Sequence, residues 1–146
     1  MEVHVRNARL TDLDAALRIL AQADELGGAD EAGYLRNLLF VPSATVVVAE
    51  AQRRIVGMGV LAIRPSVRSG PFVGVIDELG VGRGSELDDA DRRLIADHLV
   101  EHLATSARNK GCTRVEVAEP LASAEPALWK RVGFASRGRT LSRAIG

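Results

Sequence analysis

The chain has 146 residues, and its 19 lysines and arginines balance its 19 aspartates and glutamates, so the formal net charge is zero. This length suits one domain with a hydrophobic core of its own. A balanced charge argues against proteins that bind nucleic acids or membrane surfaces through excess basic residues. The single cysteine, Cys112, excludes a disulfide framework and a thiolate metal cage. We therefore expect one domain over residues 1–146, with neither nucleic-acid nor membrane partners.

Two local features bear on the compartment. Met1–Arg6 contains no basic segment followed by an apolar run, so we expect no signal peptide. The longest apolar stretch, Ile55–Ile63, is less than half as long as the ~20 residues of a membrane-spanning helix. These features favour a cytoplasmic protein.

A short strand pattern opens the chain and two helical patterns follow it. Val3–Arg6 alternates between apolar and polar residues, as a strand does. Thr11–Asp14 has the composition of a helix start, with Thr11 as the capping residue. The first helix should run to about Asp24, where Gly27–Gly28 breaks it, and a second helix is predicted over Asp30–Leu39. The apolar positions of the first helix are Leu13, Leu17, Leu20 and Ala21, and those of the second helix are Tyr34, Leu35, Leu38 and Leu39.

The middle of the chain changes to strand patterns. Thr45–Ala49 is β-branched, Ile55–Ile63 is apolar, and the short polar link between them predicts an antiparallel hairpin. A loop rich in Pro, Ser and Gly then precedes a strand over Phe72–Val81.

The C-terminal part of the chain begins with the longest periodic stretch, Ser85–Lys110, which predicts a helix. Ser85 and Asp88 have the spacing of a capping box at its start. Thr113–Val117 alternates as a strand, a short helix is predicted over Glu125–Arg131, and a last strand should begin near Phe134. The order β-α-α-β-β-β-α-β-α-β predicts an α/β layered fold. The apolar face of the long helix is predicted to consist of Ile95, Leu99, Leu103 and Ala107.

This order and three local stretches resemble the GNAT superfamily of acyl-CoA-dependent N-acetyltransferases. Val75–Val81 is similar to the family's fourth strand, and Leu94 follows Val81 by thirteen residues, which is the family's spacing. Leu128–Phe134 resembles the motif near the family's C-terminus. The resemblance covers essentially the whole chain. It implies a mixed, mostly antiparallel sheet flanked by helices on both faces.

The resemblance also implies a reaction and a site. In the family an amine attacks the thioester carbonyl of acetyl-CoA, which is held beside it. The pantetheine arm would pair with the main chain of Leu79, Gly80 and Val81, and the pyrophosphate would lie at the start of the next helix. Asp77 or Glu78 would accept the proton of the amine. Because successive strand residues point to opposite faces, we expect only one of these two acids to face the cleft.

The expected pyrophosphate motif departs from the family's pattern. Glu86–Asp91 stands where the family has glycines, and it contains four acids and no glycine or arginine. A helix N-terminus favours an anion by about 0.3–1 kcal/mol. One carboxylate about 4 Å from a phosphate oxygen opposes it by about 1 kcal/mol in water and about 4 kcal/mol near a protein surface. We therefore expect that the family's usual pyrophosphate-binding site does not bind phosphate in this chain. The acids are explained by capping of the helix. A displaced phosphate nest at Arg83 and Gly84, with Arg92 and Arg93 folded back, is the alternative.

Two further positions depart from the family. Trp129 stands where the family often has a tyrosine near the departing sulfur, and an indole cannot deliver a proton at neutral pH. Packing under the last strand is the expected role of this side chain. Ala122 occupies the approximate position of an asparagine that often follows the fifth strand.

These observations support one main hypothesis and two alternatives. The main hypothesis is an N-acyltransferase that moves an acetyl group from acetyl-CoA to a small-molecule or peptide amine, with atypical cofactor binding. The first alternative is a catalytically inactive binding or assembly module with the same fold. The second is a zinc hydrolase, because His98–His102 matches the pattern His-x-x-Glu-His, although no third ligand segment is identifiable. A homodimer is compatible with each of them, and we expect no structural metal.

Overall fold

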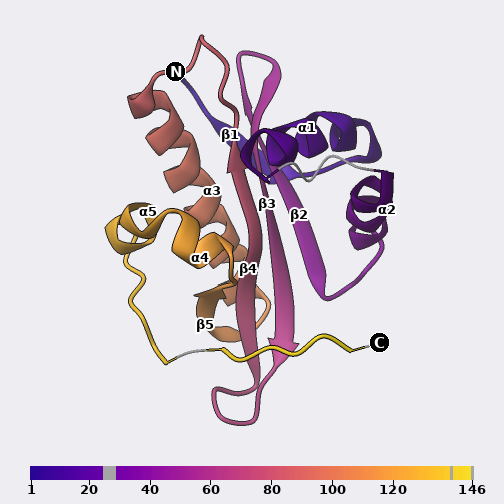
Figure 1. Cartoon of the computed structure of the whole chain (residues 1–146), viewed down its shortest axis with the longest axis vertical. Coiled ribbons are helices and arrows are strands. Elements are labelled where there is room, and N and C mark those ends of the chain that lie inside the picture. The colour runs from indigo at the N-terminus through magenta and orange to yellow at the C-terminus, as the bar shows by residue number, and fades with distance from the viewer. Residues whose placement is uncertain (25–28, 139, 146) are drawn as a thin grey trace.

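Strands from the first 117 residues of the chain form one sheet. The computed structural model describes residues 1–24, 29–138 and 140–145. Within these residues five strands lie in the order β1-β2-β3-β4-β5 (Figure 1). β1 to β4 are antiparallel neighbours, and β5 is parallel to β4. The strands are β1 His4–Asn7, β2 Ala44–Ala51, β3 Arg54–Pro65, β4 Phe72–Val81 and β5 Cys112–Val117.

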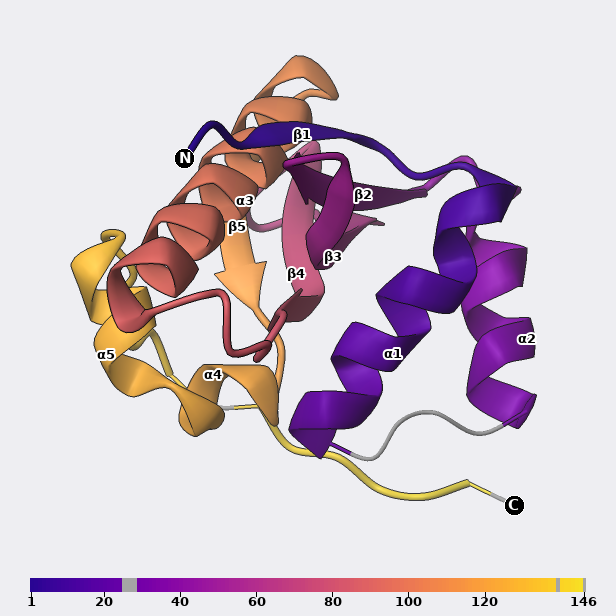
Figure 2. The ribbon, with the colours of Figure 1, turned by 90° about the horizontal axis from the view of Figure 1, so that it is seen from above.

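Helices cover both faces of this sheet, as predicted. The long helix α3, Asp89–Asn109, lies on one face, and α1, Leu13–Asp24, with α2, Ala29–Leu38, lies on the other (Figure 2). A 3-10 turn, Leu10–Asp12, precedes α1. Two short helices follow β5: α4, Leu121–Ala124, and α5, Pro126–Arg131. None of the described helices is long and apolar enough to cross a lipid bilayer. The predicted break at Gly27–Gly28 lies outside the described residues.

The sheet separates two hydrophobic cores. Alternate residues of β2 point to opposite faces, so that Val47 enters the core under α3 while Val46 and Val48 enter the core under α1. This two-sided burial explains why three consecutive valines occupy the middle of the strand. Glycine at position 57 brings α3 close to β3, because a Cβ there would lie 2.9 Å from atoms of Ile95 and Leu99. The predicted apolar face of α3 is confirmed: Ile95, Leu99, Leu103 and Ala107 are each 0% exposed.

The buried faces of the two N-terminal helices differ in part from the prediction. α1 buries Ala16, Ile19 and Leu20 most deeply, whereas Leu13 and Leu17 are only partly buried. On α2, Tyr34, one of the apolar positions from which the helix was predicted, is 67% exposed. The reason is that α2 packs into the core under α1 through Leu35 and Leu38, so a narrow apolar stripe is sufficient for it.

Both predicted helix starts are displaced. Thr11 does not cap α1; instead, the Asp12 carboxylate accepts a hydrogen bond of 2.8 Å from the Arg9 main-chain N–H at the start of the 3-10 turn. α3 begins at Asp89 and not at Ser85. Leu87 explains this second difference, because its buried side chain ties the preceding loop to the core and delays the helix.

The predicted last strand does not form in the described residues 134–138 and 140–145. Phe134 packs edge-on against Trp129 at 5.5 Å between ring centroids, which anchors the end of α5. The residues beyond it are polar or exposed, and even Leu141 and Ile145 are 81% and 98% exposed. With no apolar face to bury, this segment gains nothing from joining the sheet.

Asp12 gives the fold a measurable pH dependence. Asp12 is 8% exposed, and its carboxylate accepts hydrogen bonds of 2.7 and 3.1 Å from the Arg6 guanidinium. These bonds, with the Arg9 N–H, hold the pKa of Asp12 below its ordinary value despite burial. A lowered pKa in the folded state stabilises the protein above the unfolded pKa, near 4, and this stabilisation is lost as the pH falls through the folded value.

Replacing Asp12 by Asn is therefore expected to lower the free energy of unfolding by about 2 kcal/mol at pH 7. The loss should shrink when urea denaturation is repeated near pH 3. Asp14→Asn is the matched control, because Asp14 is exposed in the first turn of α1. Equal losses for Asp12→Asn at both pH values would contradict the assignment.

Candidate active site

The site forms where two neighbouring strands separate. β5 pairs with β4 only between Phe72 and Ile76, and the Ala118 N–H makes the last contact with the Ile76 carbonyl at 3.0 Å. From there β5 turns away into α4, while β4 continues to Val81 beside β3. On the side facing β5, the main chain of residues 79–81 therefore has no strand partner within the described part of the chain.

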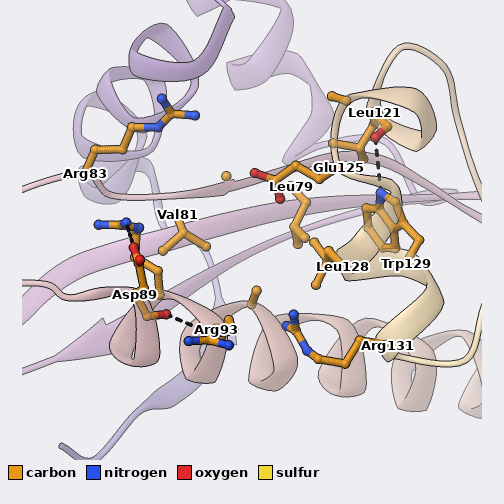
Figure 3. Close-up of a pocket in the computed structure, with 14 residues that line it drawn as sticks. Leu79, Val81, Arg83, Asp89, Arg93, Leu121, Glu125, Leu128, Trp129 and Arg131 are labelled. Carbon is orange, nitrogen blue, oxygen red and sulfur yellow. Dashed lines mark hydrogen bonds and ion pairs between the residues drawn. The ribbon is translucent and has the colours of Figure 1, made fainter.

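A cleft of about 780 Å³ occupies this separation (Figure 3). Its walls are the end of β4, the first turns of α3, and α4 with α5. The lining residues are Leu79, Gly80, Val81, Arg83, Asp89, Arg92, Arg93, Ala96, Leu121, Ala124, Glu125, Leu128, Trp129 and Arg131. Leu121, Leu128 and Trp129 form an apolar wall at α4 and α5, and Asp89 and Arg93 lie at the start of α3.

Most of the residues predicted to bind the cofactor line this cleft. Leu79, Gly80, Val81 and Arg83 are all in its wall. Gly84 is not, because it lies against the Glu86 carboxylate, whose oxygens are 2.8 Å from where its Cβ would be. The segment around Arg83 therefore contributes a side chain to the cleft but not the predicted glycine.

The four acids at residues 86–91 have separate structural partners. Glu86 forms an ion pair of 3.2 Å with Arg54. Asp88 and Asp91 cap α3 reciprocally: the Asp88 carboxylate accepts the Asp91 N–H at 2.7 Å, and the Asp91 carboxylate accepts the Asp88 N–H at 3.2 Å. Capping was the predicted role of these acids, although the pair is Asp88 with Asp91. Only Asp89 among the four lines the cleft.

Arginines outnumber acids in the cleft wall. Arg83, Arg92, Arg93 and Arg131 line it, against Asp89 and Glu125. Arg92 pairs with the Asp89 carboxylate and donates to the Leu87 carbonyl at 3.1 Å. Arg131 pairs with Asp97 at 2.7 Å.

The two remaining guanidinium groups have no carboxylate partner within the described residues. Arg83 and Arg93 are the residues concerned, and Arg93 donates only to the Asp89 main-chain carbonyl, at 3.4 Å. The sequence analysis did not predict Arg131 or Glu125 as site residues. Both come after β5, and only the turn of the chain from β5 into α4 and α5 brings them to the cleft.

Trp129 has a packing role, but not under a last strand as predicted, because the described residues after Phe134 form no strand. It is 5% exposed, and its indole N–H donates a hydrogen bond of 3.1 Å to the Leu121 carbonyl. Its one N–H is thus used to hold α5 against α4. The chain's single tyrosine, Tyr34, is on α2 and is not among the residues that line the cleft.

A β-bulge interrupts β4 at the two candidate acids. Val60 of β3 pairs with Glu78, and the next residue, Leu61, pairs with Ile76. Asp77 is therefore an extra residue on β4 with no opposite number on β3. Strict alternation of side chains does not hold across this point.

The bulge places both acids on the same side of the strand. Ile76 before it and Leu79 after it both pack into the core under α3, while a Cβ at Gly80 would meet α1. Asp77 and Glu78 therefore both lie on the face covered by α1 and α2, contrary to the expectation that they point to opposite faces. Asp77 is exposed and Glu78 is half-buried.

The histidine pair on α3 gives no support to a zinc site. His98 is exposed, whereas His102 is half-buried. Burial, and to a smaller extent the nearby His4 of β1, lower the pKa of His102. Among the described residues, no three His, Cys, Asp or Glu side chains gather as metal ligands would.

Comparison with known proteins matches the chain to one family and one fold. The model of the acetyltransferase (GNAT) family matches residues 13–134. A structure of the aminoglycoside N-acetyltransferase AAC(6')-Iy in complex with CoA superposes with a TM-score of 0.81 at 17% identity, covering 99% of this chain and 95% of that one.

Two further structures superpose over almost the whole chain. A ribosomal-protein-alanine N-acetyltransferase from Brucella melitensis biovar Abortus 2308 has a TM-score of 0.75 at 19% identity, covering 99% and 100% of the two chains. A transcriptional regulator from Bacillus halodurans C-125 has a TM-score of 0.79 at 18% identity, with the same coverage. No curated protein matches the sequence. The family match spans most of the chain, and the chain belongs to the acetyltransferase (GNAT) family.

Proposed function

We propose that this protein transfers an acetyl group from acetyl-CoA to a primary amine of a small molecule or peptide. The observation that carries the proposal is the cleft at the separation of β4 and β5. There, on the side that faces away from β3, the main chain of residues 79–81 has no strand partner among the described residues. An extended pantetheine arm with its two amides can hydrogen-bond to such a strand edge. The apolar wall made by Leu128 and Trp129 suits the uncharged part of the cofactor.

The proposed reaction is a direct transfer. The neutral amine attacks the thioester carbonyl, the new bond joins nitrogen to the acyl carbon, and the carbon–sulfur bond breaks to release the CoA thiolate. The amine must lose a proton, and Glu78 or Asp77 accepts it, directly or through water. The acids approach from the face of β4 covered by α1 and α2, so the amine enters from that side while CoA lies at the strand edge.

The leaving thiolate needs little assistance. An alkyl thiol has a pKa near 8.5, so the thiolate departs without a strong acid beside it. This agrees with a cleft whose Trp129 N–H is already bonded to the Leu121 carbonyl and whose wall contains no tyrosine among the described residues. The catalytic contribution of the protein then comes from placement and from removal of the amine proton.

Binding of acetyl-CoA is tested by thermal denaturation. Ligand at about one hundred times its dissociation constant is expected to add about 2.7 kcal/mol to the free energy of unfolding, which raises Tm. Desulfo-CoA and free adenine serve as positive and negative ligand controls. An unchanged Tm at both low and moderate salt would contradict the proposal and favour the inactive module. A Tm that falls with chelator and recovers with zinc would instead favour the metal site.

A further inference from the structure

The capping residues at the start of α3 take up part of the main-chain N–H groups that could bind a phosphate there. The Asp91 N–H is taken by the Asp88 carboxylate at 2.7 Å, and the Arg92 N–H donates to the Asp88 carbonyl at 3.0 Å. The segment has no glycine between residues 85 and 91, so side chains stand where a phosphate would need to approach the amides. If the cleft binds a phosphate-bearing cofactor, the first helical N–H groups, those of Asp89 and Ala90, are left for it, and charged side chains would supply further contacts.

Three arginine side chains are suitably placed for this. Arg83 comes from the loop after β4, and Arg92 and Arg93 come from the first turns of α3, and all three line the cleft. Figure 3 shows Arg83 and the start of α3 on either side of the end of β4, near Val81. Arginine binds phosphate oxygens with two parallel N–H groups, which compensates for the lost main-chain donors.

One carboxylate of the cleft wall already binds to this group of arginines. Asp89 forms an ion pair with the Arg92 guanidinium, and its main-chain carbonyl accepts a hydrogen bond from Arg93. Unlike Asp88 and Asp91, the Asp89 side chain has no capping role. Its side chain is 80% exposed in the cleft, so an incoming anion can reach and displace it.

We propose that Arg83, Arg92 and Arg93 hold the phosphates of acyl-CoA through their side chains, and that Asp89 is a built-in competitor which occupies Arg92 until the cofactor arrives. This inference rests on the proposed function, since it names the phosphate contacts of the same cleft. The cofactor must break the Asp89–Arg92 pair and then bear the repulsion of the released carboxylate. The affinity for CoA is thereby set lower than the arginines alone would give.

The test is a substitution that tightens binding. Asp89→Asn is expected to lower the dissociation constant of CoA about fivefold at low salt, which corresponds to the ~1 kcal/mol of one screened charge pair about 4 Å apart. Binding of pantetheine, which has no phosphate, should not change. Arg83→Gln and Arg93→Gln should weaken CoA binding, and all of these effects should diminish as salt is added. Calorimetric titration measures each constant.

Glu86→Gln is the matched control, because it removes one negative charge from the same segment without touching the cleft wall. Its affinity for CoA should equal that of the wild type. A gain in affinity cannot come from misfolding, so a tighter Asp89→Asn variant supports the proposal directly. Wild-type binding of CoA with no gain in Asp89→Asn, or an equal gain in Glu86→Gln, would overturn this inference alone. Failure of the wild type to bind CoA would overturn the proposed function together with it.

Discussion

Replacement of Glu78 by Gln is expected to lower kcat for acetyl transfer by about 10²-fold or more, the usual contribution of a positioned general base. Glu78 is half-buried on the face of β4 covered by α1 and α2, where we propose that the amine enters. The amide keeps the size of the side chain but cannot accept the proton. Steady-state rates with a panel of primary amines measure the effect, and the acid limb of the pH–rate profile should disappear in the variant.

The matched control is Asp77→Asn on the adjacent residue. Asp77 is exposed at the bulge, so its carboxylate is better solvated and we expect a smaller loss than for Glu78. The dissociation constant of CoA should stay unchanged in both variants, because neither acid lines the cofactor cleft. Normal turnover in both variants would remove the two acids from the mechanism, and a larger loss for Asp77 would transfer the role to it.

Leu103→Ala should produce the largest loss of stability, about 3 kcal/mol in the free energy of unfolding. Leu103 is 0% exposed in the middle of α3, and its Cδ1 is 3.0 Å from where a Cβ at Gly59 would lie. Such close packing leaves a cavity that neither the helix nor the sheet can close. The loss is a large fraction of the ~5–15 kcal/mol that stabilises a typical domain.

Urea denaturation measures this loss as a lower midpoint with an unchanged m-value. Leu94→Ala is the control on the same helix, because Leu94 is 37% exposed and should cost much less. Similar losses for the two leucines would show that α3 is not packed on the sheet as described. The comparison also tests the sequence interpretation, in which Leu94 opened the apolar run of this helix.

The charge of the cleft could not be predicted from which acids occupy the start of α3. The four acids within Glu86–Asp91, at the start of a helix, predict a site that repels phosphate. The structure assigns three of them to other partners: Glu86 to Arg54, and Asp88 and Asp91 to each other. The arginines that face the cleft come from three separate segments. The electrostatic outcome therefore depends on pairings that sequence distance does not reveal.

The bulge in β4 shows a second limit. Alternation along a strand predicts that Asp77 and Glu78 face opposite sides, and this rule requires an unbroken ladder. One extra residue against β3 shifts the phase, and both acids come to the same face. The apolar residues on either side read as a normal strand, so nothing local marks the insertion.

The sequence by itself determined the five strands, the helices α1, α2, α3 and α5, and the apolar face of α3. These features follow from periodicities of two and 3.6 residues, which are local properties of the chain. Only the tertiary structure decided which acids cap α3, which acid lines the cleft, and that the segment after Phe134 does not join the sheet. Those outcomes depend on contacts between residues far apart in the chain, such as Arg54 with Glu86 and Arg131 with Asp97, and on whether a segment has an apolar face to bury.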